Sequence, residues 1–481
     1  MAGGGVRDGD GAHGRGPRRR PQPPAPRRRV LVFPLPFQGH IDPMMHLAGV
    51  LHGRGLAVTV LHTRFNALSP ARHPEFRFAE VFPDGVPDDV EDVIKKGRIV
   101  EVILAMNDAM EASGAVRDVL ASVLDDGEGR RPRAAACLFI DANLLAAHKA
   151  VAALGLPTVV LRTGSAACLG CYLAYPMLHE KGYLPSQESK LCMPVPELPP
   201  LRVKDLFFSK SSHEMVSEVL ARISETVRNS SGVVINTFEA LEKAEMERLR
   251  AELNLPLLLA AGPLHKLSSK STGSSLLDQD YSCIRWLDTQ PSGSVLYVSF
   301  GSLAAMDSSE FLEVAWGLAN SGYPFLWVVR PNIVRDCEDG VVYLPDGFED
   351  AVKGGGMVIP WAPQKEVLAH PAVGGFWTHN GWNSTLEGIS EGVPMLCRPD
   401  IADQMMNTRY VHHTWGVGLE LEGKLERGKI KNSIRKLMDE REGAEMRERA
   451  KVLRRKVADC LESSGSSQTA IDRLVNYVLS L

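Results

Sequence analysis

The sequence lacks any long uninterrupted apolar segment, although hydrophobic residues make up 44% of its 481 positions. No stretch approaches the roughly 20 apolar residues of a membrane-spanning helix, so we expect no stable insertion into a membrane. Aromatic residues are few, at 6%, and the net charge is only −4. This balance is ordinary for a globular protein and does not favour nucleic acid as a partner.

Cysteine is sparse and scattered. Of eight cysteines, Cys168 and Cys171 form one C-x-x-C, and no second pair lies nearby. A structural zinc site needs four ligands, so we expect no metal. Buried free thiols are typical of a reducing compartment, and we therefore expect a cytoplasmic protein.

The first 28 residues have almost no apolar side chains. Residues 1–29 contain eight Arg and two Asp among Gly and Pro. Such a segment has too little apolar surface to form a core, which predicts disorder for residues 1–28. It has no apolar segment of the secretory type. An Arg-rich organelle transit peptide is an alternative, although the segment contains no Ser.

The rest of the chain alternates short apolar runs with amphipathic stretches, and it is too long for one core. This alternation predicts an α/β fold with parallel sheets covered on both faces. A Ser- and Gly-rich segment at 265–282 reads as a linker. We expect an N-terminal domain at 29–264 and a C-terminal domain at 283–465, with a deep cleft between them and a last helix at about 466–481 that packs back on the first domain.

The loop after the first strand, "FPLPFQGH", has no G-x-G-x-x-G. A dinucleotide-dependent oxidoreductase needs that motif at this place, so this class is disfavoured despite the alternating pattern.

The 44 residues from Trp361 to Gln404 contain the parts of a nucleotide-sugar site. Trp361 offers a flat face for a base. "HNGWNST" lies between a strand and a helix, where free N–H groups favour phosphate and Gly381 allows close approach of the backbone. Acceptor and donor groups for hydroxyls come from Glu387, Asp403 and Gln404. The plainer alternative is a polar loop in which Asn383 or Ser384 only caps the helix.

These residues closely resemble the signature box of plant family 1 UDP-glycosyltransferases, and "PFQGHIDPM" and "FGS" extend the likeness over the chain from about Arg29. The resemblance implies two facing Rossmann-like domains of the GT-B type. It implies inverting, metal-independent transfer of a sugar from a UDP-sugar to a small lipophilic acceptor, with no cofactor beyond the co-substrate. The family's donor contacts, transferred by position, place uridine at Trp361, Ala362, Gln364 and Glu387. They place the diphosphate at Ser302, His379, Asn383 and Ser384. They place the sugar at Trp382, Asp403 and Gln404. Gln404 resembles the glucose users, which makes UDP-glucose the expected donor.

His40 and Asp141 each follow a predicted strand on the cleft side, and both match the catalytic pair of the family. A neutral histidine suits removal of an acceptor proton at physiological pH, and a carboxylate behind it fixes the tautomer. A lone histidine would more often be a packed or capping residue. Thr163, in "LRTGS", matches a position near the transferred sugar, or it caps a helix.

The acceptor side is less specific. The box ends in "PDIADQ" rather than in the usual Phe-rich stretch. The overall pattern resembles the branch that acts on benzoxazinoids, diterpene acids and related metabolites, at a hydroxyl or carboxyl group. Candidate acceptor residues share apolar character, and each could equally be core: Phe37, Met106, Leu144, Met177, Leu206, Phe207 and Ala402.

Two other functions use the same fold. One is a UDP-sugar epimerase or hydrolase, which would turn over the donor without an acceptor. The other is a UDP-sugar-binding protein without catalysis, which the pairing of His40 with Asp141 disfavours. We expect the protein to be a monomer.

Overall fold

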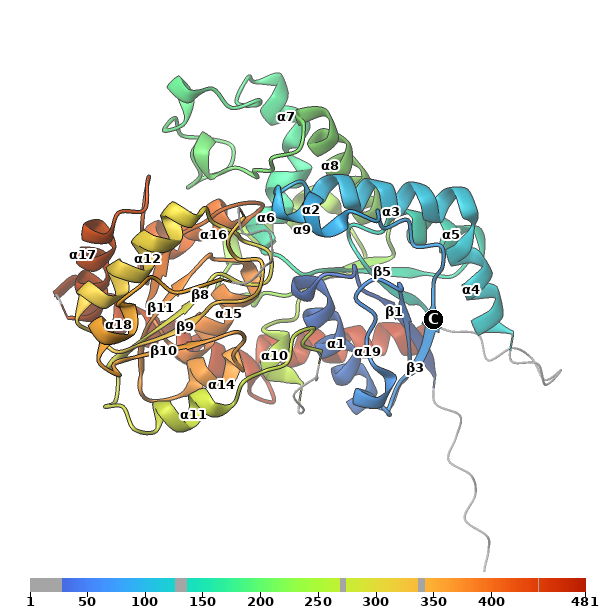
Figure 1. The fold of residues 1–481 in the computed structure, drawn as a ribbon. Helices are drawn as coiled ribbons and strands as arrows, with labels where there is room; N and C mark the ends of the chain where they lie inside the picture. The colour runs from blue at the N-terminus through green and yellow to red at the C-terminus, as the bar shows by residue number, and fades with distance from the viewer. Residues whose placement is uncertain (1–27, 126–135, 269–273, 336–341, 440) are drawn as a thin grey trace, which may run out of the picture.

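The computed structural model describes residues 28–125, 136–268, 274–335, 342–439 and 441–481. The disorder predicted for residues 1–28 therefore lies almost entirely outside the described residues. The remaining chain forms two α/β units that lie beside each other, each built on its own parallel sheet (Figure 1).

The first sheet contains seven parallel strands in the order β3-β2-β1-β4-β5-β6-β7. Its central strands are continuous apolar runs, as expected where helices cover both faces. The strands are β1 (Arg29–Phe33), β2 (Ala57–His62), β3 (Arg77–Glu80), β4 (Leu138–Asp141), β5 (Thr158–Arg162), β6 (Gly232–Ile235) and β7 (Leu258–Ala260). The helices of this part are α1 (Gln38–Gly53), α2 (Val90–Lys95), α3 (Ile99–Ser113), α4 (Ala115–Leu124), α5 (Leu145–Ala153), α6 (Ala166–Leu173), α7 (Tyr175–Glu180), α8 (His213–Arg228), α9 (Lys243–Leu253) and α10 (Leu264–Leu267), with short 3-10 turns at Pro70–Arg72, Glu188–Lys190 and Val203–Asp205.

The second sheet has six parallel strands in the order β10-β9-β8-β11-β12-β13. They are β8 (Val295–Ser299), β9 (Phe325–Val328), β10 (Gly356–Ile359), β11 (Val373–Thr378), β12 (Met395–Cys397) and β13 (Gly418–Glu420). The accompanying helices are α11 (Ser282–Leu287), α12 (Ser308–Ser321), α13 (Phe348–Val352), α14 (Gln364–Ala369), α15 (Trp382–Glu391), α16 (Gln404–Arg409), a π-helical turn at Tyr410–Thr414, α17 (Arg427–Met438) and α18 (Arg441–Leu461).

Short polar motifs decide where several helices begin. Ser165 accepts a hydrogen bond from the Cys168 N–H at the start of α6, and Ser212 does the same for Met215 at α8. Asp307 and Glu310 form a capping box at the start of α12. Each of these contacts satisfies a backbone N–H that has no partner within the helix.

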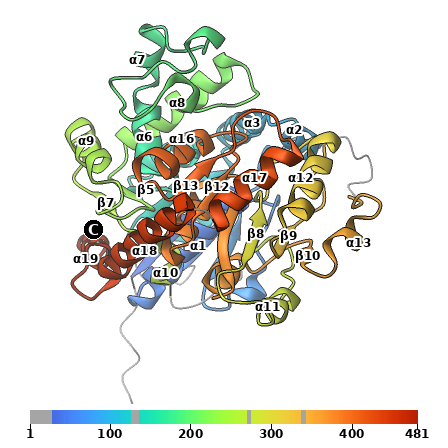
Figure 2. The ribbon, with the colours of Figure 1, turned by 90° about the vertical axis from the view of Figure 1, so that its left-hand side faces the viewer.

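The last helix, α19 (Ser466–Ser480), packs on the first sheet's side of the molecule, while α18 packs on the second. Ile471, Leu474 and Val478 belong to the core cluster that contains β1, β2 and α1. In Figure 1, α19 is the red helix that passes behind α1, and Figure 2 shows it at the edge of the molecule beside α18. The helix α10 overlaps the start of the predicted linker at 265–282, and its first residue, Leu264, is buried just before that linker.

No helix of the described residues is both long enough and apolar enough to cross a membrane.

Candidate active site

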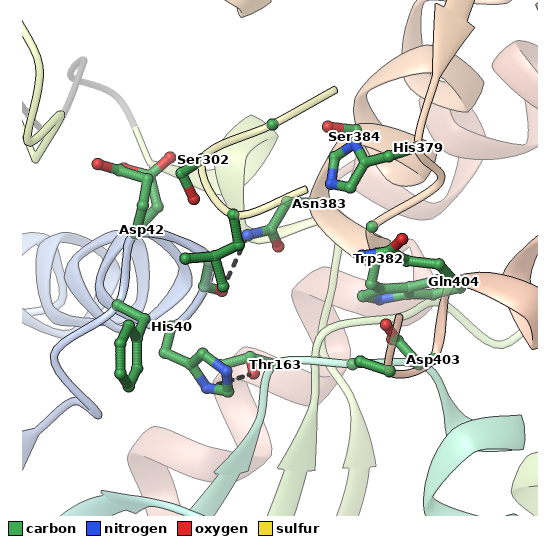
Figure 3. A pocket seen from close by; sticks show the side chains of 18 of the residues that line it. His40, Asp42, Thr163, Ser302, His379, Trp382, Asn383, Ser384, Asp403 and Gln404 are labelled. Carbon is green, nitrogen blue, oxygen red and sulfur yellow. Dashed lines mark hydrogen bonds between the residues drawn. The ribbon is translucent and has the colours of Figure 1, made fainter. Parts of the chain in front are cut away.

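A cavity of about 310 Å³ is lined by residues from both α/β units, at the carboxyl ends of their strands. This is where open parallel sheets bind ligands. The predicted donor residues all line it: Thr163, Ser302, Trp361, Ala362, Gln364, His379, Gly381, Trp382, Asn383, Ser384, Glu387, Asp403 and Gln404. Figure 3 shows His40 and Thr163 on one side, facing Trp382, Asp403 and Gln404 on the other.

His40 lies in the first turn of α1, and one of its ring nitrogens is fully engaged. Nδ1 lies 2.7 Å from Oδ2 of Asp141 and 3.1 Å from Oγ1 of Thr163. The other nitrogen, Nε2, is then the ring atom available to a ligand in the cavity, since 27% of the side chain is exposed. This arrangement orients the ring and selects the tautomer that carries its proton on Nδ1.

Asp141 ends β4 and stands behind His40 rather than in the cavity wall. Its other oxygen, Oδ1, accepts from the backbone N–H of Asn143 at 3.0 Å and from the Asn143 amide at 2.7 Å. Burial acts to raise the pKa of this carboxyl, but His40 and Asn143 outweigh it, and the pKa lies below its usual value. Asp141 is therefore a carboxylate at neutral pH, as a partner for an imidazolium must be.

The start of α15 brings together polar groups of the box. Gln364 donates from Nε2 to Oγ of Ser384 at 3.0 Å and to Oε2 of Glu387 at 2.7 Å. Burial raises the pKa of Glu387 to about 7, an effect that Lys365 and Gln364 oppose. Asn383 donates to the backbone carbonyl of Gly39 at 2.9 Å, so this side chain also joins the two units.

His379 is packed between two glycines. A Cβ on Gly301 would lie 2.5 Å from its ring, and one on Gly381 would lie 2.6 Å from its Nε2. Burial, together with the charge of Arg330, lowers the pKa of His379 to about 4. His379 is therefore a neutral hydrogen-bonding group at physiological pH, and a side chain at either glycine would displace it.

The two tryptophans of the box hold their indole N–H groups differently. Trp361 donates to Oγ of Ser275 at 3.1 Å, in the segment between the two units. Trp382 is buried and donates to the backbone carbonyl of Asn236 at 2.7 Å. The Trp382 indole therefore bridges the two units, and its N–H is not available to a sugar in this arrangement.

A family model described as "UDP-glucoronosyl and UDP-glucosyl transferase" matches residues 28–448. The chain belongs to this family. The DIMBOA UDP-glucosyltransferase BX9 of Zea mays is 46% identical over 463 residues, which cover 94% of this chain and 97% of that protein. UDP-glycosyltransferase 76B1 of Arabidopsis thaliana is 40% identical over 452 residues, covering 94% and 98%.

Solved structures agree with this assignment. Os79 of O. sativa in complex with UDP superposes with a TM-score of 0.77 at 27% identity, over 93% of this chain and 100% of that one. UGT2 of Phytolacca americana, complexed with UDP-2fluoro-glucose and pterostilbene, gives 0.76 at 29% identity, over 94% and 100%. The predicted α/β fold with two facing Rossmann-like domains of the GT-B type is confirmed. The protein is a UDP-glycosyltransferase, and the predicted glucosyl transfer agrees with the activity in the names of its family and of the maize relatives.

The predicted acceptor residues of this transferase divide into two groups. Phe37, Phe207 and Ala402 line the cavity. Met106, Leu144 and Leu206 are buried in the core of the first unit, and Met177 packs at the edge of that core. The structure does not bring these four to the cavity, because their positions face the packed interior.

Several residues that line the cavity were not predicted. Lys365 and Arg162 line the cavity, as do Gln38 and Ser275. Arg162 directly precedes Thr163 at the end of β5, which is a local signal that sequence reasoning could have used. Ser275 approaches Trp361 only through the fold, and no local pattern marks it.

Within residues 28–125, 136–268, 274–335, 342–439 and 441–481, no group of three or more His, Cys, Asp or Glu residues is placed to hold a metal ion.

Proposed function

We propose that this transferase moves glucose from UDP-glucose to a hydroxyl or carboxyl group of a small lipophilic metabolite, giving a β-glucoside. The observation that carries the proposal is His40, whose Nδ1 is held by Asp141 and Thr163 in a cavity that the predicted UDP-sugar residues also line. One cavity thus contains a base and the parts of a donor site.

In the proposed reaction, Nε2 of His40 takes the proton of the acceptor O–H. The acceptor oxygen forms a bond to C1 of glucose on the face opposite UDP, and the bond from C1 to the phosphate oxygen breaks. UDP leaves with that electron pair, and the configuration at C1 is inverted. Asp141 stabilises the imidazolium that forms.

The leaving diphosphate is proposed to lie at the start of α15, near Ser302, His379, Asn383 and Ser384. Fixed N–H and hydroxyl donors at a helix start stabilise developing negative charge without reorganising. This supports a reaction that needs no divalent metal and no cofactor beyond UDP-glucose, and 5 mM EDTA should leave the rate unchanged.

The acceptor is proposed to bind against the apolar part of the cavity, which Phe37, Ile99, Ile103, Tyr172, Phe207 and Ile223 line. Aromatic and branched aliphatic walls favour a compact lipophilic molecule. DIMBOA is the acceptor named for the maize relatives, and we include benzoxazinoids, phenols and terpenoid acids in the proposed class. We also propose that the protein acts as a monomer in the cytoplasm.

The test is the rate of glucoside formation, read by mass spectrometry, in His40→Ala. Loss of a general base costs about 10²–10⁴-fold in kcat, while UDP affinity should change little, because His40 acts on the acceptor. His52→Ala is the control, since His52 lies on the same helix and packs against Phe76. Activity of His40→Ala within threefold of the parent would refute the proposed base.

An epimerase, a hydrolase and a binding protein give different results in one assay. UDP-glucose consumption without an acceptor would indicate hydrolysis or epimerisation, and binding without any turnover would indicate a binding protein. Transfer should depend strictly on the acceptor.

A further inference from the structure

Arg162 is a buried cation in the wall of the active-site cavity. It ends β5, one residue before Thr163, and is 4% exposed. Its Nη2 donates to Sγ of Cys168 at 3.1 Å, and its Cζ lies 4.6 Å from the ring centroid of Tyr172. Among the described groups, none forms a hydrogen bond with Nε of Arg162.

The partners of Arg162 on α6 do not neutralise its charge. Burial raises the pKa of the Cys168 thiol to about 11, despite the opposing effect of Arg162, and burial also raises the pKa of Tyr172. Both side chains are therefore uncharged at neutral pH. A thiol and an aromatic face are weak partners for a guanidinium, so compensation must come from carboxylates.

Two carboxylates act on Arg162 electrostatically, Asp141 from the same domain and Asp403 from the other. Asp141 already has both oxygens engaged, with His40 and Asn143. Asp403 is half-buried, and among the described residues no Lys or Arg, Arg162 included, lies within ion-pair distance of its carboxylate. Asp403 is thus the carboxylate that depends most on the charge of Arg162.

The Arg162 guanidinium and the Asp403 carboxylate both lie close to the position that a side chain on Gly164 would occupy. A Cβ on Gly164 would lie 2.9 Å from Nη2 of Arg162 and 3.4 Å from Oδ2 of Asp403. The missing side chain of Gly164 therefore allows a cation of the first domain and a carboxylate of the second to approach across the cleft.

We propose that Arg162 is a positioning residue for sugar transfer that acts through Asp403: its guanidinium faces the Asp403 carboxylate across the cleft without a direct ion pair, and favours the ionised form that accepts hydrogen bonds from the donor sugar. The inference rests on the proposed function. Because the two residues belong to different domains, the sugar site is complete only when the domains are together.

The titration of Asp403 gives a readout that a purely structural role would not affect. Burial raises the pKa of Asp403, and Arg162 lowers it, with help from Asn407 and His40. The other groups that face this pair are Asp141 at the end of β4 and Cys168 and Tyr172 of α6. Without the guanidinium, Asp403 should be protonated up to a higher pH, and a protonated carboxyl is a weaker acceptor.

The experiment compares Arg162→Met, Arg162→Lys and Gly164→Ala with the parent, at saturating acceptor and varied UDP-glucose, from pH 6 to 8.5. We expect Arg162→Met to lower kcat/KM for UDP-glucose by about ten- to a hundredfold, most at low pH and least at high pH. Arg162→Lys should restore part of this loss. The affinity for UDP, measured by calorimetry, should stay within about twofold in all variants.

Gly164→Ala tests the same pair of charges without removing either, because its methyl group would displace the guanidinium. Gly170→Ala is the matched control. It lies in α6 near the same residues, and a Cβ there would meet no atom within 4 Å, so its activity should equal that of the parent.

Two results would overturn the inference while leaving the proposed function intact. One is an unchanged kcat/KM for UDP-glucose in both Arg162→Met and Gly164→Ala. The other is an equal loss of UDP and UDP-glucose affinity in every variant, which would mark Arg162 as structural. A parent protein that transfers no glucose would instead refute the proposed function, and the inference with it.

Discussion

At the level of single side chains, Gln404 uses its amide oxygen within the protein and leaves its amide N–H groups for the cavity. Its Oε1 accepts from the backbone N–H groups of Asp400 at 2.8 Å and Ile401 at 3.1 Å. The sequence suggested that Gln404 both donates to and accepts from sugar hydroxyls. In the structure its oxygen holds the loop before α16, and only its N–H groups are left to donate to the sugar.

Gln404→Glu separates these two uses. The new carboxylate can still accept from Asp400 and Ile401, but it has no N–H to donate and adds negative charge beside Asp403. We expect kcat/KM for UDP-glucose to fall about ten- to a hundredfold, the cost of a lost buried partner, with UDP affinity nearly unchanged. Initial rates over a range of UDP-glucose concentrations check this. A variant with parental kcat/KM would show that donation from Gln404 does not matter.

Glu387 should make donor binding depend on pH. Its pKa is raised from the usual 4.5 to about 7 by burial, so it is mostly protonated below pH 7 and ionised above. An ionised carboxylate is the stronger acceptor for a ribose hydroxyl, and KM for UDP-glucose should therefore fall as pH rises from 6 to 8.

The control is Glu387→Gln, which cannot titrate. The ratio of its KM to the parental KM should rise from near one at pH 6 to about fivefold at pH 8. A ratio that does not change with pH would contradict the proposed role of Glu387.

The site residues differ in how readily they could be identified from the sequence alone. The box residues lie within 44 consecutive positions, and their polar groups have no good use in a core, so the sequence indicated them directly. Met106, Leu144 and Leu206 could not be sorted in this way, because an apolar residue looks the same whether it faces a core or a cavity. The interaction of Arg162 with Asp403 joins positions far apart in sequence, and only the fold brings them together.

At the level of elements, the start of α1 is tied to the segment between the domains. Gln38 accepts from the backbone N–H of Leu276 at 2.7 Å and donates to the Ser274 carbonyl at 3.3 Å. Asp42, one turn further on, accepts from the Ser274 hydroxyl. The neighbouring Ser275 accepts from Trp361, so the helix that carries His40 is linked to the residue proposed to stack on uracil.

The alternation of strands and helices was predictable from sequence, whereas this contact was not, because a Ser-rich segment has no periodicity that fixes its path.

Gln38→Ala should loosen this connection. We expect KM for UDP-glucose to rise about five- to tenfold through loss of two hydrogen bonds, with a smaller change in kcat. Steady-state kinetics separate the two parameters. Gln290→Ala is the control, since the half-buried side chain of Gln290 donates, among the described residues, only to the neighbouring Thr289 hydroxyl. A fall in kcat at constant KM would instead mean that Gln38 acts on His40.

At the level of the whole molecule, α19 completes the first domain with the last residues of the chain. Leu474 is fully buried in the core formed with α1, β1 and β2, and Leu474→Ala should cost about 2–5 kcal/mol. Two-domain proteins rarely unfold in one step, so the measurement is the midpoint of the first thermal transition, which should fall by at least about 4 °C. Leu479→Ala, at a site 51% exposed on the same helix, should shift it by less than about 2 °C. Equal shifts for the two variants would mean that α19 does not stabilise the first domain.

The chain crosses between the domains twice, before α11 and again between α18 and α19, and the two crossings meet where the Ser467 hydroxyl donates to the Gly262 carbonyl at 2.6 Å. Two connections that lie close together restrict the relative motion of the domains to a hinge rotation. A single linker would also allow one domain to twist against the other. The hinge then lies at Gly262 and Ser467, and the part of the cleft farthest from these two residues undergoes the largest displacement. A single cut in the first crossing would leave the two halves joined through the second, and the cleft could still close in its original alignment.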